Sequence, residues 1–135
     1  AAAAEKVEGL WRAVGMRVKR AEAGVHDRWV AAVSHMPHAV AFGLMNAVGG
    51  DEEALEAAAG SFQDMTRVAG SDVEMWTDIF LTNRAAVVAA IDGFAGELAA
   101  LRGAIEAGDG RRVGELVARA KGLREAFVTR RKGKP

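Results

Sequence analysis

The stretch from residue 30 to residue 48, VAAVSHMPHAVAFGLMNAV, constrains the fold of this chain more than any other. Its apolar residues recur at steps of three and four, which predicts a helix. The opposite side of that helix is scarcely more polar, and a helix that is apolar all round is normally buried on every side. We therefore expect a buried central helix that runs from about Val25 to Val48.

A polar cluster, Ser34-His35-Met36-Pro37-His38, interrupts this apolar pattern. Helical geometry places Ser34 and His38 one turn apart and turns His35 roughly a quarter-turn away. Unpaired polar groups in an interior cost free energy, and Pro37 removes a backbone donor that a helix would use. Polar side chains on an apolar helix and a proline within it are both unfavourable, and two such departures in one segment indicate a functional site.

Several kinds of chemistry fit this polar cluster. The two histidines could hold a metal with His26 and Asp27, but a zinc site needs about three convergent ligands and the glutamate of the HExxH pattern is missing. Ser34 and His38 could form a nucleophile and its base, although no nucleophile elbow surrounds the serine. Histidines that bond to backbone or water in a core are the plain structural alternative. The remaining alternative is recognition of an anionic ligand by imidazoles.

A lone arginine marks the segment Gly60–Gly70, GSFQDMTRVAG, which has no clear amphipathic period. Arg67 is the only Lys or Arg between Arg28 and Arg84, in a stretch that holds eight Asp and Glu. Asp64 lies three residues earlier, close enough to form an ion pair if the segment is helical. An arginine among apolar neighbours also suits a carboxylate ligand. Both interpretations remain open from the residues alone.

The regions on either side of the central helix carry signals for shorter elements. In chain order we expect a helix over Glu5–Val14 ended by Gly15, a short strand or extended connector over Met16–Lys19, a stop to the central helix at Gly49-Gly50, and a brief helix from an Asp51 cap to Gly60.

The last part of the chain predicts long helices. Ser71 to Glu74 read as a capping box with Ser71 at the N-cap, followed by a helical pattern that continues to Ile105. Because so long a helix is unusual in a globular protein, we expect a break near Asn83 or Gly93, or pairing with another chain. The final expected elements are a turn at Ala107–Gly110, a helix over Val113–Phe127 and a basic tail over Arg130–Pro135.

Composition narrows the class of protein. Half of the 135 residues are hydrophobic and 27% are charged with no net charge, which is typical of one soluble globular domain. The lack of cysteine excludes disulfides and thiolate chemistry, and no apolar run reaches the roughly 18 residues of a membrane span. Residues 107–135 carry 9 Lys and Arg against 3 Asp and Glu, which we interpret as a solvated helix face. We expect an all-α protein with no metal, nucleic-acid or membrane partner.

Two long motifs carry a family resemblance. HDRWVAAVSHMPHAVAFGL and GSFQDMTRVAGSDVEMWTDIFLTN resemble, in sequence, order and separation, the C-terminal helical domain of the prephenate dehydrogenases of tyrosine biosynthesis, the TyrA family. The resemblance covers roughly Glu5 to Phe127. It implies a helical dimerisation and substrate-binding domain over residues 1–135, of the type seen at the C-terminus of 6-phosphogluconate dehydrogenase. It also implies an N-terminal Rossmann domain outside this sequence, so we expect the chain to be part of a longer protein.

The resemblance implies substrate-binding residues and no catalytic residue in this chain. His38, in the family's S-H-x-P-H pattern, is expected nearest to substrate. Arg67 is expected to be buried and to bind one carboxylate of the prephenate dianion, with Asp64 as its ion-pair neighbour and Trp76 close to the pocket entrance. The complete implied set is Ser34, His35, His38, Gly60, Asp64, Arg67 and Trp76.

The implied whole enzyme is a cytoplasmic homodimer that oxidatively decarboxylates prephenate to 4-hydroxyphenylpyruvate. Its cofactor, NAD or NADP, is expected in the Rossmann domain, so the present chain alone should bind no cofactor and show no activity. Arogenate is the alternative substrate. One departure is that Gly60 is followed by Ser61, where the family often has a run of glycines. The alternative function is a stand-alone helical dimerisation module or a regulatory tyrosine-binding module.

Overall fold

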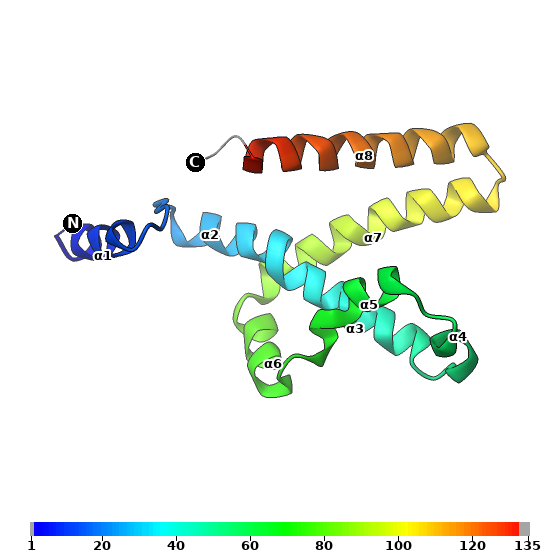
Figure 1. Cartoon of the computed structure of the whole chain (residues 1–135), viewed down its shortest axis with the longest axis horizontal. Coiled ribbons are helices and arrows are strands. Elements are labelled where there is room, and N and C mark those ends of the chain that lie inside the picture. Colours follow the sequence, from blue (N-terminus) through cyan, green and yellow to red (C-terminus); the bar gives the residue numbers. More distant parts are fainter. Residues whose placement is uncertain (1, 133–135) are drawn as a thin grey trace. The chain divides into compact units, whose positions relative to one another are not determined.

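The computed structural model describes residues 2–132, and every regular element among them is a helix, which confirms the all-α class (Figure 1). The elements are α1 (Ala2–Ala13), α2 (Ala23–Val30), a π-helical turn (Ala31–His35), α3 (Met36–Val48), α4 (Glu52–Glu56), α5 (Gly60–Thr66), a 3₁₀ helix (Arg67–Gly70), α6 (Val73–Thr82), α7 (Arg84–Glu106) and α8 (Gly110–Lys132). Two compact units divide the chain: a first unit, Ala1–Val87, and a second unit, Val88–Pro135. No helix of residues 2–132 is long and apolar enough to cross a membrane.

The predicted central helix is confirmed as a helical run from Ala23 to Val48, but its hydrogen-bonding pattern changes in the middle. In the π-turn, the Met36 N–H donates to the carbonyl of Ala31, five residues back. Pro37 then lies in the first turn of α3, so its missing backbone donor falls where the hydrogen-bonding pattern changes from the π-turn to the α-helix. The proline therefore begins a new helical segment, and the wider π-turn carries the chain into it. Such turns are frequent at functional sites.

Burial of this run on every side was predicted, and that prediction is wrong for the first unit. Among the residues of the helical run from Ala23 to Val48 only Ala31 and Ala41 are buried, and Val33 is 77% exposed. α5 and the 3₁₀ helix pack against α3, and the other faces are covered less completely. Periodicity reports which side chains are apolar, whereas burial depends on how many other elements reach them.

Local stop and start signals account for several helix boundaries. Gly15, with φ of +79°, follows α1 in a conformation that favours glycine. α3 ends at Val48 before the two glycines, as expected. The Asp51 carboxylate accepts the Ala54 N–H at 3.0 Å and caps α4, which confirms the predicted cap. α4 ends at Glu56 rather than reaching Gly60, and the predicted strand or connector is an irregular connector between α1 and α2.

The start of α6 lies one residue later than predicted. Asp72 is its N-cap, and the carboxylate accepts the Met75 N–H at 2.8 Å. The Ser71 hydroxyl instead donates to the Val68 carbonyl at 2.7 Å, at the end of the 3₁₀ helix. The capping box centred on Ser71 is therefore wrong, because the preceding 3₁₀ helix engages that hydroxyl. The predicted break of the long pattern falls at Asn83, between α6 and α7.

The second unit consists of most of α7 together with α8, joined by the predicted turn. Gly108 adopts φ of +63° there, and the Asp109 carboxylate caps α8 by accepting the Arg112 N–H at 2.9 Å. α8 extends to Lys132, beyond the predicted end at Phe127, so the first part of the expected basic tail is helical. Residues 133–135 of that tail lie outside the described residues.

Candidate functional site

A cluster of aromatic side chains surrounds Trp76, which is only 7% exposed. The Trp76 indole stacks on the His38 imidazole, with ring centroids 3.6 Å apart and planes 20° apart. The His35 ring meets the same indole edge-on, at 6.1 Å and 85°. We call this set the histidine–tryptophan cluster; its members are His35, His38, Phe42, Trp76 and Phe80. It joins the π-turn and α3 to α6.

His38 is oriented by the backbone of the preceding turn. Its Nδ1 lies 2.9 Å from the Ser34 carbonyl oxygen. A carbonyl can only accept, so Nδ1 donates, and in a neutral imidazole Nε2 is left as an acceptor. Ser34 thus contributes its carbonyl rather than its hydroxyl to this contact. The alternative of a Ser34–His38 nucleophilic pair gains no support, because no bond joins that hydroxyl to His38 in the described part of the chain.

His35 is favoured in its neutral form. Partial burial lowers its pKa from the ordinary 6.5, the nearby charge of His38 lowers it further, and the Asp27 carboxylate opposes both effects. The Nδ1 atom of His35 lies 3.4 Å from the Asn83 side-chain nitrogen. An amide nitrogen can only donate, so this Nδ1 acts as the acceptor. Asn83 is a member of the site that sequence reasoning placed only at a helix break.

Two hollows border the cluster within the first unit. The smaller, of about 410 Å³, is lined by His26, Asp27, Val30, Ser34, His35, Asp78, Ile79, Thr82 and Asn83. It therefore collects polar and ionisable groups from α2, the π-turn and the end of α6. His26 Nδ1 lies 3.2 Å from the Asp27 carboxylate in this hollow. No group of three His, Asp or Glu side chains suited to a metal ion occurs within residues 2–132.

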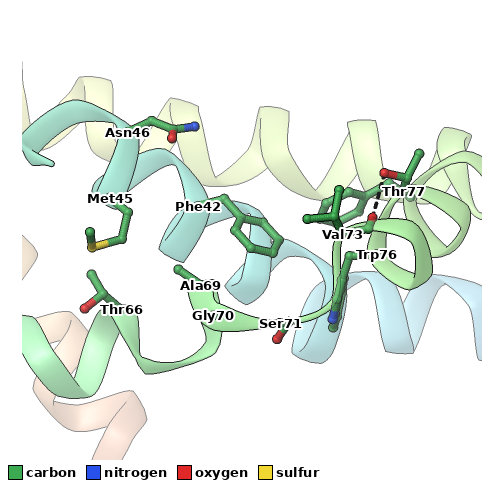
Figure 2. Close-up of a pocket in the computed structure, with 11 residues that line it drawn as sticks. Phe42, Met45, Asn46, Thr66, Ala69, Gly70, Ser71, Val73, Trp76 and Thr77 are labelled. Atoms are coloured by element: carbon green, nitrogen blue, oxygen red, sulfur yellow. Dashed lines mark hydrogen bonds between the residues drawn. The ribbon is translucent and has the colours of Figure 1, made fainter. Parts of the chain in front are cut away.

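The larger hollow, of about 600 Å³, is a groove between α3, α6 and the segment that connects α5 to α6 (Figure 2). The rings of Phe42 and Trp76 and the Met45 side chain point toward it, and the backbone at Gly70 forms part of its edge. The polar residues of its lining are Asn46, Thr66, Ser71 and Thr77. None of the lining side chains is charged, so the groove suits an aromatic or aliphatic surface rather than an ionic group.

The structure brings together four of the seven predicted site residues: Ser34, His35, His38 and Trp76. The other three, Gly60, Asp64 and Arg67, are exposed on α5 and the 3₁₀ helix. Burial of Arg67 was predicted, and that prediction is wrong. The expected ion pair also fails, since nothing in the described residues joins Asp64 to Arg67, which leaves the guanidinium open to solvent.

The fold and site define a class of protein: an all-helical domain in which a buried indole of α6 meets two imidazoles, one stacked on it from α3 and one edge-on from the π-turn. A family described as "Prephenate dehydrogenase, dimerization domain" matches residues 22–119. This match covers more than half of the chain. The chain belongs to the family of prephenate dehydrogenase dimerisation domains.

Individual relatives agree with this assignment. The chain is 38% identical over 109 residues to cyclohexadienyl dehydrogenase of Zymomonas mobilis, covering 77% of this chain and 37% of that protein. It is 29% identical over 135 residues to prephenate dehydrogenase of Bacillus subtilis, covering 97% and 36%. The chain thus spans little more than a third of the length of these oxidoreductases.

Solved structures give the same result. The crystal structure of prephenate dehydrogenase from A. aeolicus in complex with hydroxyphenyl propionate and NAD+ is similar with a TM-score of 0.84 and 35% identity, covering 91% of this chain and 44% of that one. Synechocystis arogenate dehydrogenase has a TM-score of 0.83 at 22% identity, covering 91% and 46%, and supports the fold alone.

Proposed function

We propose that residues 1–135 form the C-terminal dimerisation and substrate-binding domain of a prephenate dehydrogenase. The complete enzyme would oxidatively decarboxylate prephenate to 4-hydroxyphenylpyruvate with NAD or NADP. The family match over residues 22–119 is the observation that carries this proposal. The histidine–tryptophan cluster supports it, because it concentrates hydrogen-bonding imidazoles beside a groove that can receive a ring.

The proposed substrate is a dianion with a ring hydroxyl, and the exposed polar groups of the first unit match its chemistry. Arg67 has no ion-pair partner in residues 2–132, so its planar guanidinium is available for a two-pronged bond to a carboxylate. α5 and the 3₁₀ helix that begins at Arg67 pack against α3, which carries His38. We propose Ser34, His35, His38, Gly60, Asp64, Arg67 and Trp76 as the substrate-binding set.

The chain's own residues would bind and orient substrate rather than transfer hydride. A bound nicotinamide supplies the hydride acceptor, and we assign it to an N-terminal domain beyond this sequence. No strand–turn–helix unit with a G-x-G-x-x-G fingerprint is found in the described residues, so none of them is assigned to the cofactor. Selectivity would arise because a ligand that lacks the matching carboxylate leaves Arg67 and the imidazoles unpaired.

We further propose that the protein acts as a homodimer through the second unit. Among its described residues only Ala104 is buried, while Leu98 and Leu123 are 53% and 67% exposed. Both leucines line a groove of about 490 Å³ between α7 and α8. A pair of helices with this much exposed apolar surface needs a further surface to cover it, and an obligate helical interface typically buries upward of about 2,000 Å².

The experiment that tests the proposed function measures reduction of NAD+ and NADP+ by the full-length protein with prephenate and with arogenate. We expect turnover with at least one pair and none with the 135-residue chain alone. Turnover by this chain alone would contradict the proposal that the nicotinamide cofactor is bound by a separate N-terminal domain. A full-length protein that oxidises neither substrate while binding tyrosine would instead identify a regulatory module.

A further inference from the structure

Asn83 is the single residue between α6 and α7, and its backbone serves both helices. Its N–H donates to the Ile79 carbonyl at 3.2 Å, and its own carbonyl accepts the Val87 N–H at 3.0 Å. Its φ of −105° and ψ of 30° lie outside the α-helical region. Any residue that readily adopts non-helical dihedral angles could make this break. The break between the helices therefore does not explain why the Asn83 side chain makes the contacts that it does.

The Asn83 side chain reaches two groups far away in the sequence. Its Nδ2 lies 2.9 Å from the Asp27 backbone carbonyl and 3.4 Å from His35 Nδ1. Because the carbonyl of Asp27 can only accept, the nitrogen of the amide, and not its oxygen, faces this side. The NH₂ group has two hydrogens, so one can go to Asp27 and the other to His35. The nitrogen of His35 that receives it must carry a lone pair.

We propose that Asn83 is a positioning residue that holds neutral His35 in the Nε2–H tautomer, so that His35 presents a hydrogen-bond donor to the ligand. The other nitrogen of a neutral imidazole carries the proton when Nδ1 accepts. Nε2 of His35 has no partner within residues 2–132, and His35 lines the 410 Å³ hollow. The proposal rests on the proposed function only for the identity of the ligand.

The two imidazoles then present opposite groups. Neutral His38 donates through Nδ1 to the Ser34 carbonyl, which leaves its Nε2 as an acceptor. Neutral His35 accepts at Nδ1 from Asn83, which leaves its Nε2 as a donor. No buried side-chain nitrogen or oxygen in the described chain lacks a partner, so both free Nε2 atoms face solvent-accessible space. Because His35 lines the 410 Å³ hollow, a ligand that places a hydrogen-bond acceptor there matches its Nε2 donor.

The charged surroundings agree with a neutral His35. The titratable groups that face it from the packed elements are His26 and Asp27 on α2, His38 on α3 and Asp78 on α6. Burial and His38 lower the pKa of His35, against the opposing charge of Asp27. A protonated His35 would also direct an Nδ1–H at the amide hydrogens of Asn83. The contact geometry and the charges therefore favour the same state.

The decisive variant is Asn83→Asp, which keeps the size of the side chain and replaces the amide donor with an acceptor. Asn83→Ala removes the group altogether and serves if the carboxylate prevents folding. Asn46→Asp is the matched control for the tautomer, because Asn46 is the other asparagine of the chain and forms no hydrogen bond to a histidine among the described residues. His35→Gln assigns the His35 signals among the three histidines.

The tautomer is measured by nitrogen-15 NMR of the full 135-residue chain labelled at histidine, at a pH where His35 is neutral. We expect Nε2–H in the wild type and in Asn46→Asp. We expect a change to Nδ1–H, or to the protonated ring, in Asn83→Asp, and a mixture of tautomers in Asn83→Ala. Wild-type His35 in the Nδ1–H form would overturn the proposal. So would folded Asn83 variants that melt at lower temperature yet keep the wild-type tautomer, since this is the behaviour of a residue that only ends a helix.

A kinetic readout links the tautomer to the ligand. In the full-length protein, Asn83→Asp should raise the KM for prephenate roughly tenfold, the effect of one lost bond to a charged group, while kcat changes less. Arg12→Ala, at an arginine of α1 that pairs with Glu8 and lines neither hollow, should leave KM within about twofold. A changed tautomer with an unchanged KM would refute the ligand-directed role of His35. A full-length protein without dehydrogenase activity would contradict the proposed function. The tautomer of His35 would still be established, because the NMR measurement does not depend on that activity.

Discussion

The two compact units differ in how much of their apolar surface they bury by themselves. In the first unit, α5 and the 3₁₀ helix pack against α3, and Trp76 is buried within the histidine–tryptophan cluster. Among the described residues of the second unit only Ala104 is buried, and Phe94, Leu98 and Leu123 stay substantially exposed. The first unit thus contains a small core of its own. The second unit has a stripe of exposed apolar side chains along α7 and α8, which needs another surface to cover it.

This difference separates two tasks. A site that orients imidazoles needs fixed neighbours, and aromatic packing supplies them within one unit. A dimerisation surface needs the opposite, because side chains that already found partners within the chain would offer nothing to a second copy. The largest effects of mutation on assembly are therefore expected in the second unit, and those on substrate binding in the first.

The largest effect should come from the exposed stripe of the second unit. Leu98→Arg combined with Leu123→Arg should weaken dimerisation at least about 1,000-fold, because each leucine would lose a hydrophobic contact worth about 2 kcal/mol and occurs in both copies. Sedimentation of the 135-residue chain at micromolar concentration measures this. Leu81→Arg, at an exposed leucine of α6 in the first unit, is the control and should leave the dimer intact. A wild-type chain that sediments as a monomer would contradict the prediction.

Trp76→Ala should lower the free energy of unfolding by about 3–5 kcal/mol, since it removes the buried centre of the histidine–tryptophan cluster. Trp29→Ala is the matched control in the same unit. Trp29 is 42% exposed and its ring lies 4.0 Å from the Lys19 ammonium, so its loss should cost about 1 kcal/mol or less. Urea unfolding at one protein concentration gives both values. Equal losses for the two tryptophans would show that the first unit has no core of its own.

Arg67→Ala in the full-length enzyme should raise the KM for prephenate by about 30- to 1,000-fold, or 2–4 kcal/mol, with a smaller effect on kcat. A bond to a carboxylate present in both ground and transition states contributes uniform binding. Lysine should restore only part of it, because it lacks the planar pair of donors. His38→Ala should weaken binding less. Arg12→Ala, at an arginine that pairs with Glu8 on α1, is the control. Near-normal kinetics with a lower melting temperature would assign Arg67 a structural role instead.

The smallest effect concerns the pH dependence of stability. Burial and the charge of His38 lower the pKa of His35 below its ordinary 6.5, so the unfolded chain binds this proton more readily than the folded one. The contribution to stability is therefore fully present above pH 6.5 and is lost as pH falls from there toward the lower folded-state pKa. His35→Gln should flatten this part of the profile in urea unfolding, and His26→Gln, at an exposed ring, should not. An unchanged slope in His35→Gln would argue against a neutral, partly buried imidazole.

Much of the secondary structure could be predicted because its determinants are local. The Gly15 stop, the Asp51 cap, the turn around Gly108 and the break at Asn83 each depend on residues within one helical turn. The predicted N-cap at Ser71 failed even at this range. Both Ser71 and Asp72 can cap a helix, and only the presence of the 3₁₀ helix before them decides which one does.

The candidate site was predicted less completely. The sequence pattern identified Ser34, His35 and His38 as polar groups on an apolar helix, and the structure packs both histidines against Trp76. It gave no sign that Arg67 is exposed, because a short segment without amphipathic period does not reveal which face is covered. The π-turn was also missed, since the proline signals a disturbed helix but not how the backbone bonds rearrange.

The sequence by itself determined the helical class, most helix ends and the placement of two histidines beside a proline, since propensity, caps and spacing act over a few residues. The tertiary structure alone decided how those histidines are used. Asn83 reaches Asp27 across 56 positions and His35 across 48, and the stack of Trp76 on His38 spans a similar distance along the chain. Such contacts exist only when the helices have packed, because no local rule brings together groups that far apart in sequence.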